Sequence, residues 1–355
     1  MRRLLMKIGR GPYMKITKRS IFSFVIALLI GVFLSLYQLP YYIYKPGEAD
    51  SLKPIVSVEG GYNSAGEMHL VTVRGGPATP MQYLLAKILP HQEIVSIDEV
   101  IPEGVDEEEY FHSQLLMMES SQQASVIVAY KAANKPIDIE YNGVYVVSVI
   151  DDMPASGILE SGDVIVGVDG HEIHEADDLI QYIEGKKAGD SITLDILRDD
   201  KPLIKKITLE AFADQEDKVG IGIKLVTDRH VNVKPEVHFS SGNIGGPSAG
   251  LMFALEIYDQ LTEEDLTKGL NIVGSGEIDY DGKVHRIGGI DKKVVAAHRK
   301  GCDIFFAANE NGRKDSNYEV AKQTAEQIGT DMKIIPVDTF EDALRYLQQL
   351  KPSPK

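Results

Sequence analysis

The most apolar stretch of the chain lies near its N-terminus. Residues 20–44 carry no charged side chain, and their core reads IFSFVIALLIGVFLSLY. About 20 apolar residues, rising 1.5 Å each, span the hydrocarbon core of a bilayer. The pattern therefore predicts a transmembrane anchor at 20–44, preceded by a tail at 1–19. An aromatic belt at the membrane interface is expected from the tyrosines that follow: Tyr37, Tyr41, Tyr42 and Tyr44.

Charge around this stretch is uneven and sets an orientation. Residues 1–46 hold eight Lys or Arg and no Asp or Glu, although the whole chain has a formal net charge of −16. By the positive-inside rule the tail is cytoplasmic, and everything after Lys45 is extracytoplasmic. We therefore expect a single-pass protein of the cell membrane. A cleaved signal peptide is the alternative, but no A-x-A-like cleavage site follows the apolar run.

The pattern of polar and apolar positions between residues 46 and 135 predicts a linker, a strand and a helix. Residues 46–53 are polar, contain Gly and Pro, and predict a linker. EMHLVTVRG at 67–75 has the alternation of a strand. Residues 113–135 repeat apolar side chains at helical spacing and predict a helix.

Residues 143–210 have short runs and frequent turns. GVYVVSVI predicts a strand, VIVGVDGHEI a hairpin that turns at Asp169-Gly170, and SITLDILRDDKPLIKKITL another hairpin. Between the hairpins, ADDLIQYIEG predicts a short amphipathic helix that ends at Gly185. Several strands and one helix in about 70 residues indicate a compact independent module.

From residue 219 onward, strand patterns and helical patterns alternate. IGIKLVT, VNVKPEVHF, INIVGSG and CDIFFAA read as strands, while AGLMFALEIYDQL, GGIDKKVVAAHRKG and TFEDALRYLQQL read as helices. The pattern predicts a mixed α/β domain. With the module at 143–210, the fold class is α+β.

Composition excludes several classes of function. The part of the chain after residue 46 is strongly acidic and repels phosphate backbones, so nucleic acid is not an expected partner. Cys302 is the single cysteine, which excludes an intrachain disulfide and thiolate metal clusters. His171 and His174 form HEIH rather than a zinc-binding HExxH and are expected at the surface. We therefore expect neither a metal nor a cofactor.

One glycine-rich stretch, SGNIGGPSAG at 241–250, has the residues of a nucleophilic site. It places Ser248 just before an apolar helix. Unpaired backbone N–H groups and the helix dipole at such a position favour an oxyanion. Two alternatives remain open at this point. Ser248 is simply the N-cap of the helix, or the G-x-S-x-G spacing belongs to a Ser-His-Asp hydrolase that uses His285 or His298.

A candidate base lies in the helix predicted from about residue 290. Ile290, Lys293, Val294 and Ala297 share one stripe of that helix, so Lys293 is on the apolar face, whereas Asp291, Lys292 and Arg299 point elsewhere. Burial penalises the charged form of a lysine and leaves an amine that accepts a proton. The alternative is a lysine whose charged end reaches solvent at the edge of the buried face.

These motifs resemble the proteolytic domain of Lon proteases. GPSAG is followed 45 residues later by the lysine of GGIDKKVVAAHRKG, with VGSGEIDYDGKVHRIGGI between them. The resemblance implies a Ser-Lys dyad of Ser248 and Lys293, with Ser275 where Lon has a threonine that supports the lysine. Backbone at Gly246, Pro247 and Ala249 is expected to hold the oxyanion.

The module between residues 136 and 211 resembles a PDZ domain. SGILESGDVIVGVDGHEI is similar to the bacterial PDZ pattern. The resemblance places a carboxylate-binding loop at Gly143, Val144, Tyr145 and Val146, where backbone N–H groups hold a peptide C-terminus. A PDZ-like unit that only packs against its neighbour is the alternative.

Together these features resemble the membrane-anchored, PDZ-containing Lon-like serine proteases (the YlbL type). The implied organisation has the first part of the Lon-like domain, with the linker, at 45–135, the PDZ domain inserted at 136–211, and the dyad-bearing part at 212–350. The chain has no G-x-x-x-x-G-K-[ST] motif. The expected function is therefore ATP-independent serine endopeptidase activity on extracytoplasmic unfolded or membrane proteins, in a possible homo-hexamer. A catalytically inactive, membrane-tethered PDZ scaffold is the alternative.

Overall fold

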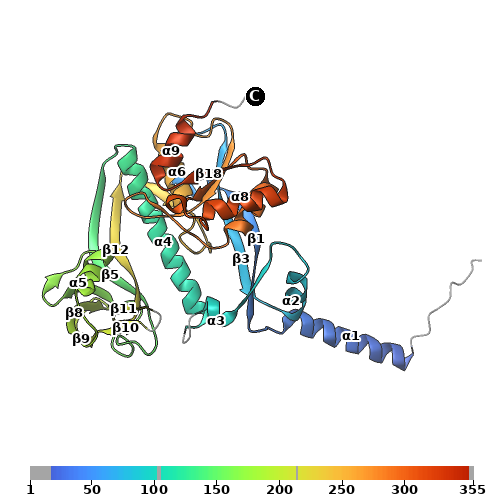
Figure 1. Ribbon diagram of the computed structural model, residues 1–355, viewed down its shortest axis with the longest axis horizontal. Coiled ribbons are helices and arrows are strands. Elements are labelled where there is room, and N and C mark those ends of the chain that lie inside the picture. The colour runs from blue at the N-terminus through green and yellow to red at the C-terminus, as the bar shows by residue number, and fades with distance from the viewer. Residues whose placement is uncertain (1–16, 102–104, 213–214, 352–355) are drawn as a thin grey trace, which may run out of the picture.

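The computed structural model describes residues 17–101, 105–212 and 215–351, and it shows a mixed α/β body, a smaller β-rich body and one projecting helix (Figure 1). The helices are α1 (Lys18–Leu36), α2 (Pro80–Ala86), α3 (Ile97–Val100), α4 (Glu107–Ala132), α5 (Ala176–Glu184), α6 (Gly250–Leu261), α7 (Ile290–Lys300), α8 (Asn317–Ile328) and α9 (Phe340–Gln348). The main strands are β1 (Tyr41–Ser51), β3 (Glu67–Pro77), β4 (Glu93–Ser96), β5 (Ile137–Val149), β6 (Val164–Val168), β8 (Ser191–Arg198), β9 (Lys201–Thr208), β12 (Ile223–Val233), β14 (Asn271–Ser275), β17 (Ile304–Ala308) and β18 (Lys333–Val337). Shorter strands are β2 (Val56–Val58), β7 (His171–Glu172), β10 (Glu210–Phe212), β11 (Gln215–Gly220), β13 (Val237–Phe239), β15 (Glu277–Ile278) and β16 (Val284–His285).

Helix α1 projects from the body and is long and apolar enough to cross a membrane. None of its side chains is buried in the protein. Most of the basic tail, including Arg2, Arg3 and Lys7, lies outside the described residues.

The structure corrects the predicted end of the anchor. The helix ends at Leu36 rather than near residue 44. Tyr41, Tyr42 and Tyr44 lie in β1, which pairs antiparallel with both β3 and β4. The predicted linker at 46–53 is largely the second half of β1, because its backbone groups pair with β3 despite its polar composition.

A six-stranded sheet joins parts of the chain that lie far apart in sequence. Its order is β18-β17-β14-β3-β1-β4. Strand β14 runs parallel to β3 on one side and to β17 on the other. Residues before and after the β-rich body therefore complete one sheet, and the β-rich body is an insertion within that fold.

Alternate residues of this sheet face two different helical layers. Met68, Leu70 and Phe306 join the core formed with α4, α6 and α9, whereas Val71 and Phe305 join the core formed with α7 and α8. Helices α4 and α6 pack closely at Gly250, where a Cβ atom would lie 2.6 Å from Ser121 Oγ. The sheet thus has helices on both faces, and α6 and α7 approach its centre from opposite sides.

The inserted unit has its own sheet and core. Its sheet order is β12-β5-β6-β8-β9, and α5 packs on it. The core continues past the expected boundary at 211, since Ile221 is buried in it and Leu225 packs against it. The first strand predicted after residue 219 continues into the start of the second as one long strand, β12, which pairs along the whole of β5. The end of the second predicted strand forms β13, which pairs with β2.

Candidate active site

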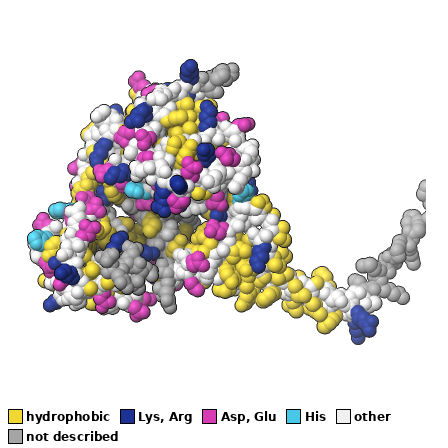
Figure 2. Space-filling model, viewed as in Figure 1, with side chains coloured by type: hydrophobic (Ala, Val, Ile, Leu, Met, Phe, Trp, Pro, Cys, Tyr) yellow, Lys and Arg dark blue, Asp and Glu magenta, His cyan; other side chains and the backbone are white. Residues whose placement is uncertain are grey.

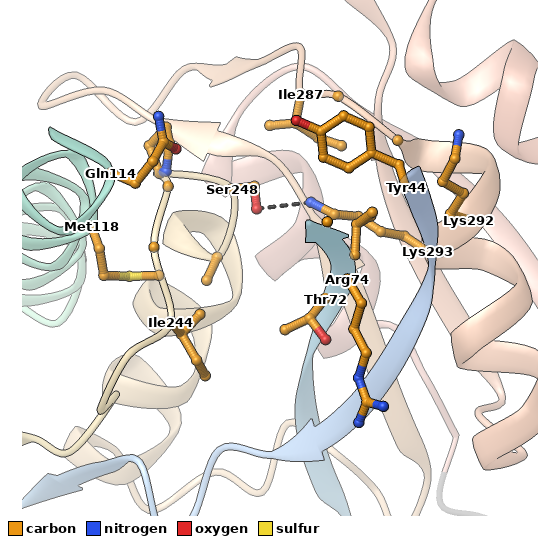
Figure 3. A pocket seen from close by; sticks show the side chains of 18 of the residues that line it. Tyr44, Thr72, Arg74, Gln114, Met118, Ile244, Ser248, Ile287, Lys292 and Lys293 are labelled. Atoms are coloured by element: carbon orange, nitrogen blue, oxygen red, sulfur yellow. Dashed lines mark hydrogen bonds between the residues drawn. The ribbon is translucent and has the colours of Figure 1, made fainter. Parts of the chain in front are cut away.

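Ser248 lies in the turn that leads into α6. The N-cap of α6 is Ala249, and no side chain caps the helix. Ser248 therefore does not act as the capping residue, which was one of the two alternatives for this position. Its hydroxyl points instead across the cleft toward α7 (Figure 3).

Lys293 lies in the first turn of α7, and its side chain reaches Ser248. Its Nζ atom is 2.8 Å from Ser248 Oγ and 2.9 Å from Ser275 Oγ. The residue is only 4% exposed. No carboxylate contributes to the shift of its pKa, which burial alone lowers to about 7. A lysine in this state exists partly as a neutral amine at neutral pH, which is the form that accepts a proton.

Ser275 connects the two other residues. It is the last residue of β14, is fully buried, and donates from Oγ to the Ser248 carbonyl at 3.1 Å. Its position at the end of a central strand fixes it between α6 and α7. The three side chains predicted from the sequence are therefore brought together by three separate elements. This arrangement can activate a serine hydroxyl, because a neutral amine lies within hydrogen-bonding distance of it.

The structure corrects part of the predicted oxyanion site. The N–H of Gly246 donates to the Gln114 carbonyl at 2.8 Å, and Pro247 has no N–H to give. Within the described residues, the N–H groups of Ser248 and Ala249 have no protein acceptor. Ala249 thus remains a candidate, and the N–H of Ser248 itself is a donor that the sequence reasoning missed.

The structure also corrects the prediction for Lys292, which the helical pattern places away from the protein interior. It is 4% exposed and lines the same cleft as Lys293. Its Nζ pairs with Glu93 Oε2 at 2.7 Å and with Asp291 Oδ2 at 3.2 Å. These carboxylates, one of them from β4, hold its charge in place. Lys292 therefore differs from Lys293, for which no carboxylate partner appears among the described residues.

The histidines of the alternative hydrolase lie elsewhere. His285 is exposed and pairs with Asp279 Oδ2 at 2.8 Å, and His298 is exposed near the end of α7. Neither lines the cleft that contains Ser248. Within the described ranges, no group of three or more His, Cys, Asp or Glu side chains is arranged to hold a metal ion.

The cleft around Ser248 has a volume of about 1090 Å³. Its walls come from β1 and β3, from α4 and from the loop before α6 (Figure 3). Strand β3 pairs with β14 only as far as Leu70, although it continues to Pro77. Within the described part of the chain, residues 71–75 therefore keep one backbone edge without a strand partner on the side of β14, and residues of that segment line the cleft.

The prediction of a carboxylate-binding loop in the PDZ unit is wrong. Gly143, Val144, Tyr145 and Val146 lie inside β5, between β12 and β6, rather than in a loop. Val144 and Val146 are fully buried. Backbone groups that already pair with strands on both sides are not available to a peptide.

A groove elsewhere on the PDZ unit has the shape expected of a peptide-binding site. It has a volume of about 360 Å³ and runs between α5 and the segment 218–225, with Gly220 and Gly222 at its centre. Strand β12 is at the edge of its sheet, so its outer side is open to another strand. Apolar side chains line the groove from both elements: Leu179, Ile180, Ile183, Ile221, Ile223 and Leu225.

Comparisons with known proteins agree with this division of the chain. Residues 209–349 match the Lon protease (S16) C-terminal proteolytic domain, and residues 106–209 match the PDZ domain. The chain carries a PDZ domain and a Lon-type serine-peptidase domain. The PDZ match begins in α4, although α4 packs in the core of the larger body with α6.

Individual relatives cover parts of the chain. The Lon protease of Campylobacter jejuni is 31% identical over 137 residues, which are 37% of this chain and 16% of that protein. The Lon protease of Aster yellows witches'-broom phytoplasma is 35% identical over 97 residues, 27% of this chain and 11% of that one. The PDZ domain of the SdrC-like protein from Listeria monocytogenes is 39% identical, covering 25% of this chain and 93% of that chain at a TM-score of 0.23. The chain thus spans less than a fifth of the length of these Lon relatives.

Proposed function

We propose that this chain is a membrane-anchored serine endopeptidase that cleaves extracytoplasmic unfolded or membrane proteins without ATP. Ser248 is the nucleophile and Lys293 the general base. The observation that supports this most strongly is the 2.8 Å approach of the buried Lys293 Nζ to Ser248 Oγ. Burial lowers the pKa of Lys293 to about 7, so it takes the hydroxyl proton without a histidine.

The reaction then follows from the positions of the residues. The Ser248 hydroxyl attacks the peptide carbonyl, and its proton passes to Lys293. The N–H groups of Ser248 and Ala249 hold the oxyanion, and protonated Lys293 returns the proton to the leaving amine. A substrate segment pairs as an extended strand with residues 71–75 of β3, which presents its carbonyl to Ser248. Water then releases the acyl group by the same proton transfers in reverse.

The absence of a Walker A motif from this chain supports activity without ATP. The test is hydrolysis of casein by the full chain in detergent, with ATP omitted. Cleavage by the parent and by neither Ser248→Ala nor Lys293→Ala supports the proposal. No cleavage by the parent, together with intact peptide binding, favours the inactive scaffold. A homo-hexamer, expected from the resemblance, is tested on the same sample by its mass in solution.

Ser275 is a positioning residue in this account. Replacing it with alanine removes the hydroxyl 2.9 Å from Lys293 Nζ and is expected to lower kcat about tenfold to a hundredfold. Ser275→Thr keeps the hydroxyl and is expected to restore most of the activity. The midpoint of the pH profile separates the role in positioning from a general loss of stability. It is expected to move in Ser275→Ala and to stay in place in Ser275→Thr.

For the PDZ domain we propose that the groove beside α5 binds the C-termini of substrates. The glycine-containing segment 220–222 receives the carboxylate, and the peptide adds to the edge of β12. The anisotropy of a labelled decapeptide with an apolar C-terminal residue is the measurement. Ile180→Asp, at a half-exposed groove position, is expected to weaken binding about tenfold or more.

Ile204→Asp is the matched control, because Ile204 is 73% exposed on β9 and does not line the groove. It is expected to leave binding unchanged. Amidation of the peptide C-terminus is expected to abolish binding in the parent. Equal binding of the amidated and free peptides would show that the groove does not recognise a carboxylate.

A further inference from the structure

A second apolar surface lies next to the proposed anchor, on and just after α2. Figure 2 shows a continuous hydrophobic area there that joins the apolar surface of α1. Scattered exposed apolar residues are ordinary, but a contiguous patch marks a contact with a partner or a membrane. We call this surface the α2 patch. Its residues, with their exposed fractions, are Met81 (44%), Leu84 (55%), Leu85 (44%), Ile88 (80%) and Leu89 (45%).

The α2 patch results from an inverted arrangement of side chains. A surface helix normally turns its large apolar side chains inward. Here the small side chains of Ala78 and Ala86 are buried against Ile43, and the large ones point out. The segment is well defined, because Thr79 and Gln82 form a capping box and Pro80 occupies the first turn. Met81, Leu84 and Leu85 therefore belong to a fixed helix, and Ile88 and Leu89 extend the patch into the turn that follows it.

Backbone hydrogen bonds join the segment just after α1 to the segment just before α2. The N–H of Leu39 donates to the Ala78 carbonyl at 2.8 Å, and the N–H of Ala78 donates to the Tyr41 carbonyl at 2.7 Å. Leu39 follows the last residue of α1 by three positions and also packs on the small cluster under α2. When α1 spans a bilayer, α2 is thus held at the level where the chain leaves it.

The chemistry of the segment suits a lipid surface. Residues 77–92 contain no Asp or Glu and one lysine, within a chain whose formal net charge is −16. That lysine, Lys87, places its Nζ 4.6 Å from the centre of the Tyr83 ring. A tyrosine beside a lysine at the rim of an apolar surface is typical of the membrane interface.

We propose that the α2 patch inserts into the bilayer interface beside α1 and forms a second membrane contact. This inference rests on the proposed anchoring by α1. A single helix alone leaves the protein free to rotate and tilt, whereas two contacts fix its orientation. Strand β3 links the patch to the active site, because Thr72 lines the catalytic cleft and Pro77 ends the strand beside α2. Five residues of strand correspond to about 17 Å. The cleft is therefore held close to the membrane, where it meets juxtamembrane segments of substrates.

Depth-sensitive fluorescence tests the insertion directly, because the chain contains no tryptophan. Four single-tryptophan variants of the full chain are reconstituted in phosphatidylcholine vesicles, with and without lipids brominated along the acyl chain. Ile88→Trp and Leu84→Trp report on the patch, and Leu29→Trp reports on α1. Ile204→Trp on the PDZ domain is the matched exposed control.

Insertion predicts that brominated lipid quenches both patch tryptophans about twofold, that it also quenches Leu29→Trp, and that it leaves Ile204→Trp unchanged. Quenching of Leu29→Trp without quenching at either patch position overturns the inference and leaves the anchor intact. A blue-shifted but unquenched patch tryptophan also overturns it, since protein, such as a second copy of the chain, then covers the patch. No quenching of Leu29→Trp refutes the anchoring itself and the inference with it.

Discussion

Replacing Lys293 with methionine or arginine is expected to lower kcat for peptide hydrolysis by about 10³-fold or more. Methionine fills a similar volume but has no amine, and arginine keeps a cation that cannot give up its proton. Either change leaves Ser248 without a base, because Lys293 Nζ is the titratable group that contacts its hydroxyl. Initial rates on a quenched fluorescent peptide, with circular dichroism to confirm folding, are the measurement.

The neighbouring lysine provides a matched control for this prediction. Lys292→Met removes an equally buried amine, but one that pairs with Glu93 and not with Ser248. It is expected to lower the rate far less than Lys293→Met. His285→Ala tests the alternative hydrolase and is expected to keep nearly full activity. A large loss in His285→Ala with little loss in Lys293→Met would contradict the dyad.

Activity is expected to rise with pH and level off above about pH 8. The folded-state pKa of Lys293 is lowered to about 7 by burial, and only its neutral form is a base. Well below that pKa, kcat/KM is expected to fall about tenfold for each pH unit, since the fraction of neutral amine falls by that factor. The same burial makes the charged form unfavourable, so the folded protein also loses stability as the pH falls from the ordinary lysine range toward 7.

The pH profile distinguishes this site from a solvent-exposed lysine. An exposed amine would place the midpoint of kcat/KM near pH 10.4. A profile that is flat between pH 6 and 9 would show that Lys293 does not titrate during catalysis. Measurements on a small peptide avoid effects of pH on the unfolding of a protein substrate.

The sequence alone predicts the local positions of Ser248 and Lys293. Ser248 precedes an apolar helix, and Lys293 lies on the apolar stripe of another, so both positions are fixed by local periodicity. Their 2.8 Å approach depends on α6 and α7 meeting the same sheet from opposite faces. The periodicity does not predict that arrangement of the two helices, and the pairing of Ser248 with Lys293 was predicted from the resemblance to Lon proteases.

Several differences between the sequence-based predictions and the structure come from contacts between residues that lie far apart in the sequence. The residue pattern from Gly143 onward predicts a strand, and the structure confirms it; the loop at Gly143 and Val144 came from the PDZ resemblance, whereas β12, some 80 residues later, pairs with them as interior strand. Tyr41 and Tyr44 fall within the predicted anchor, but they lie in β1, which pairs with β3 and β4. The burial of Lys292 likewise depends on Glu93 from β4, which no helical pattern reveals.

The most direct test of the central claim is the rate at which Ser248 reacts with a fluorophosphonate probe. Peptide mapping by mass spectrometry identifies the modified residue in the full chain and in Lys293→Met. The account predicts modification at Ser248 in the parent, at a rate that rises with pH around an apparent pKa near 7, and almost none in Lys293→Met. Equal rates in the two proteins, or modification at another residue, would contradict it.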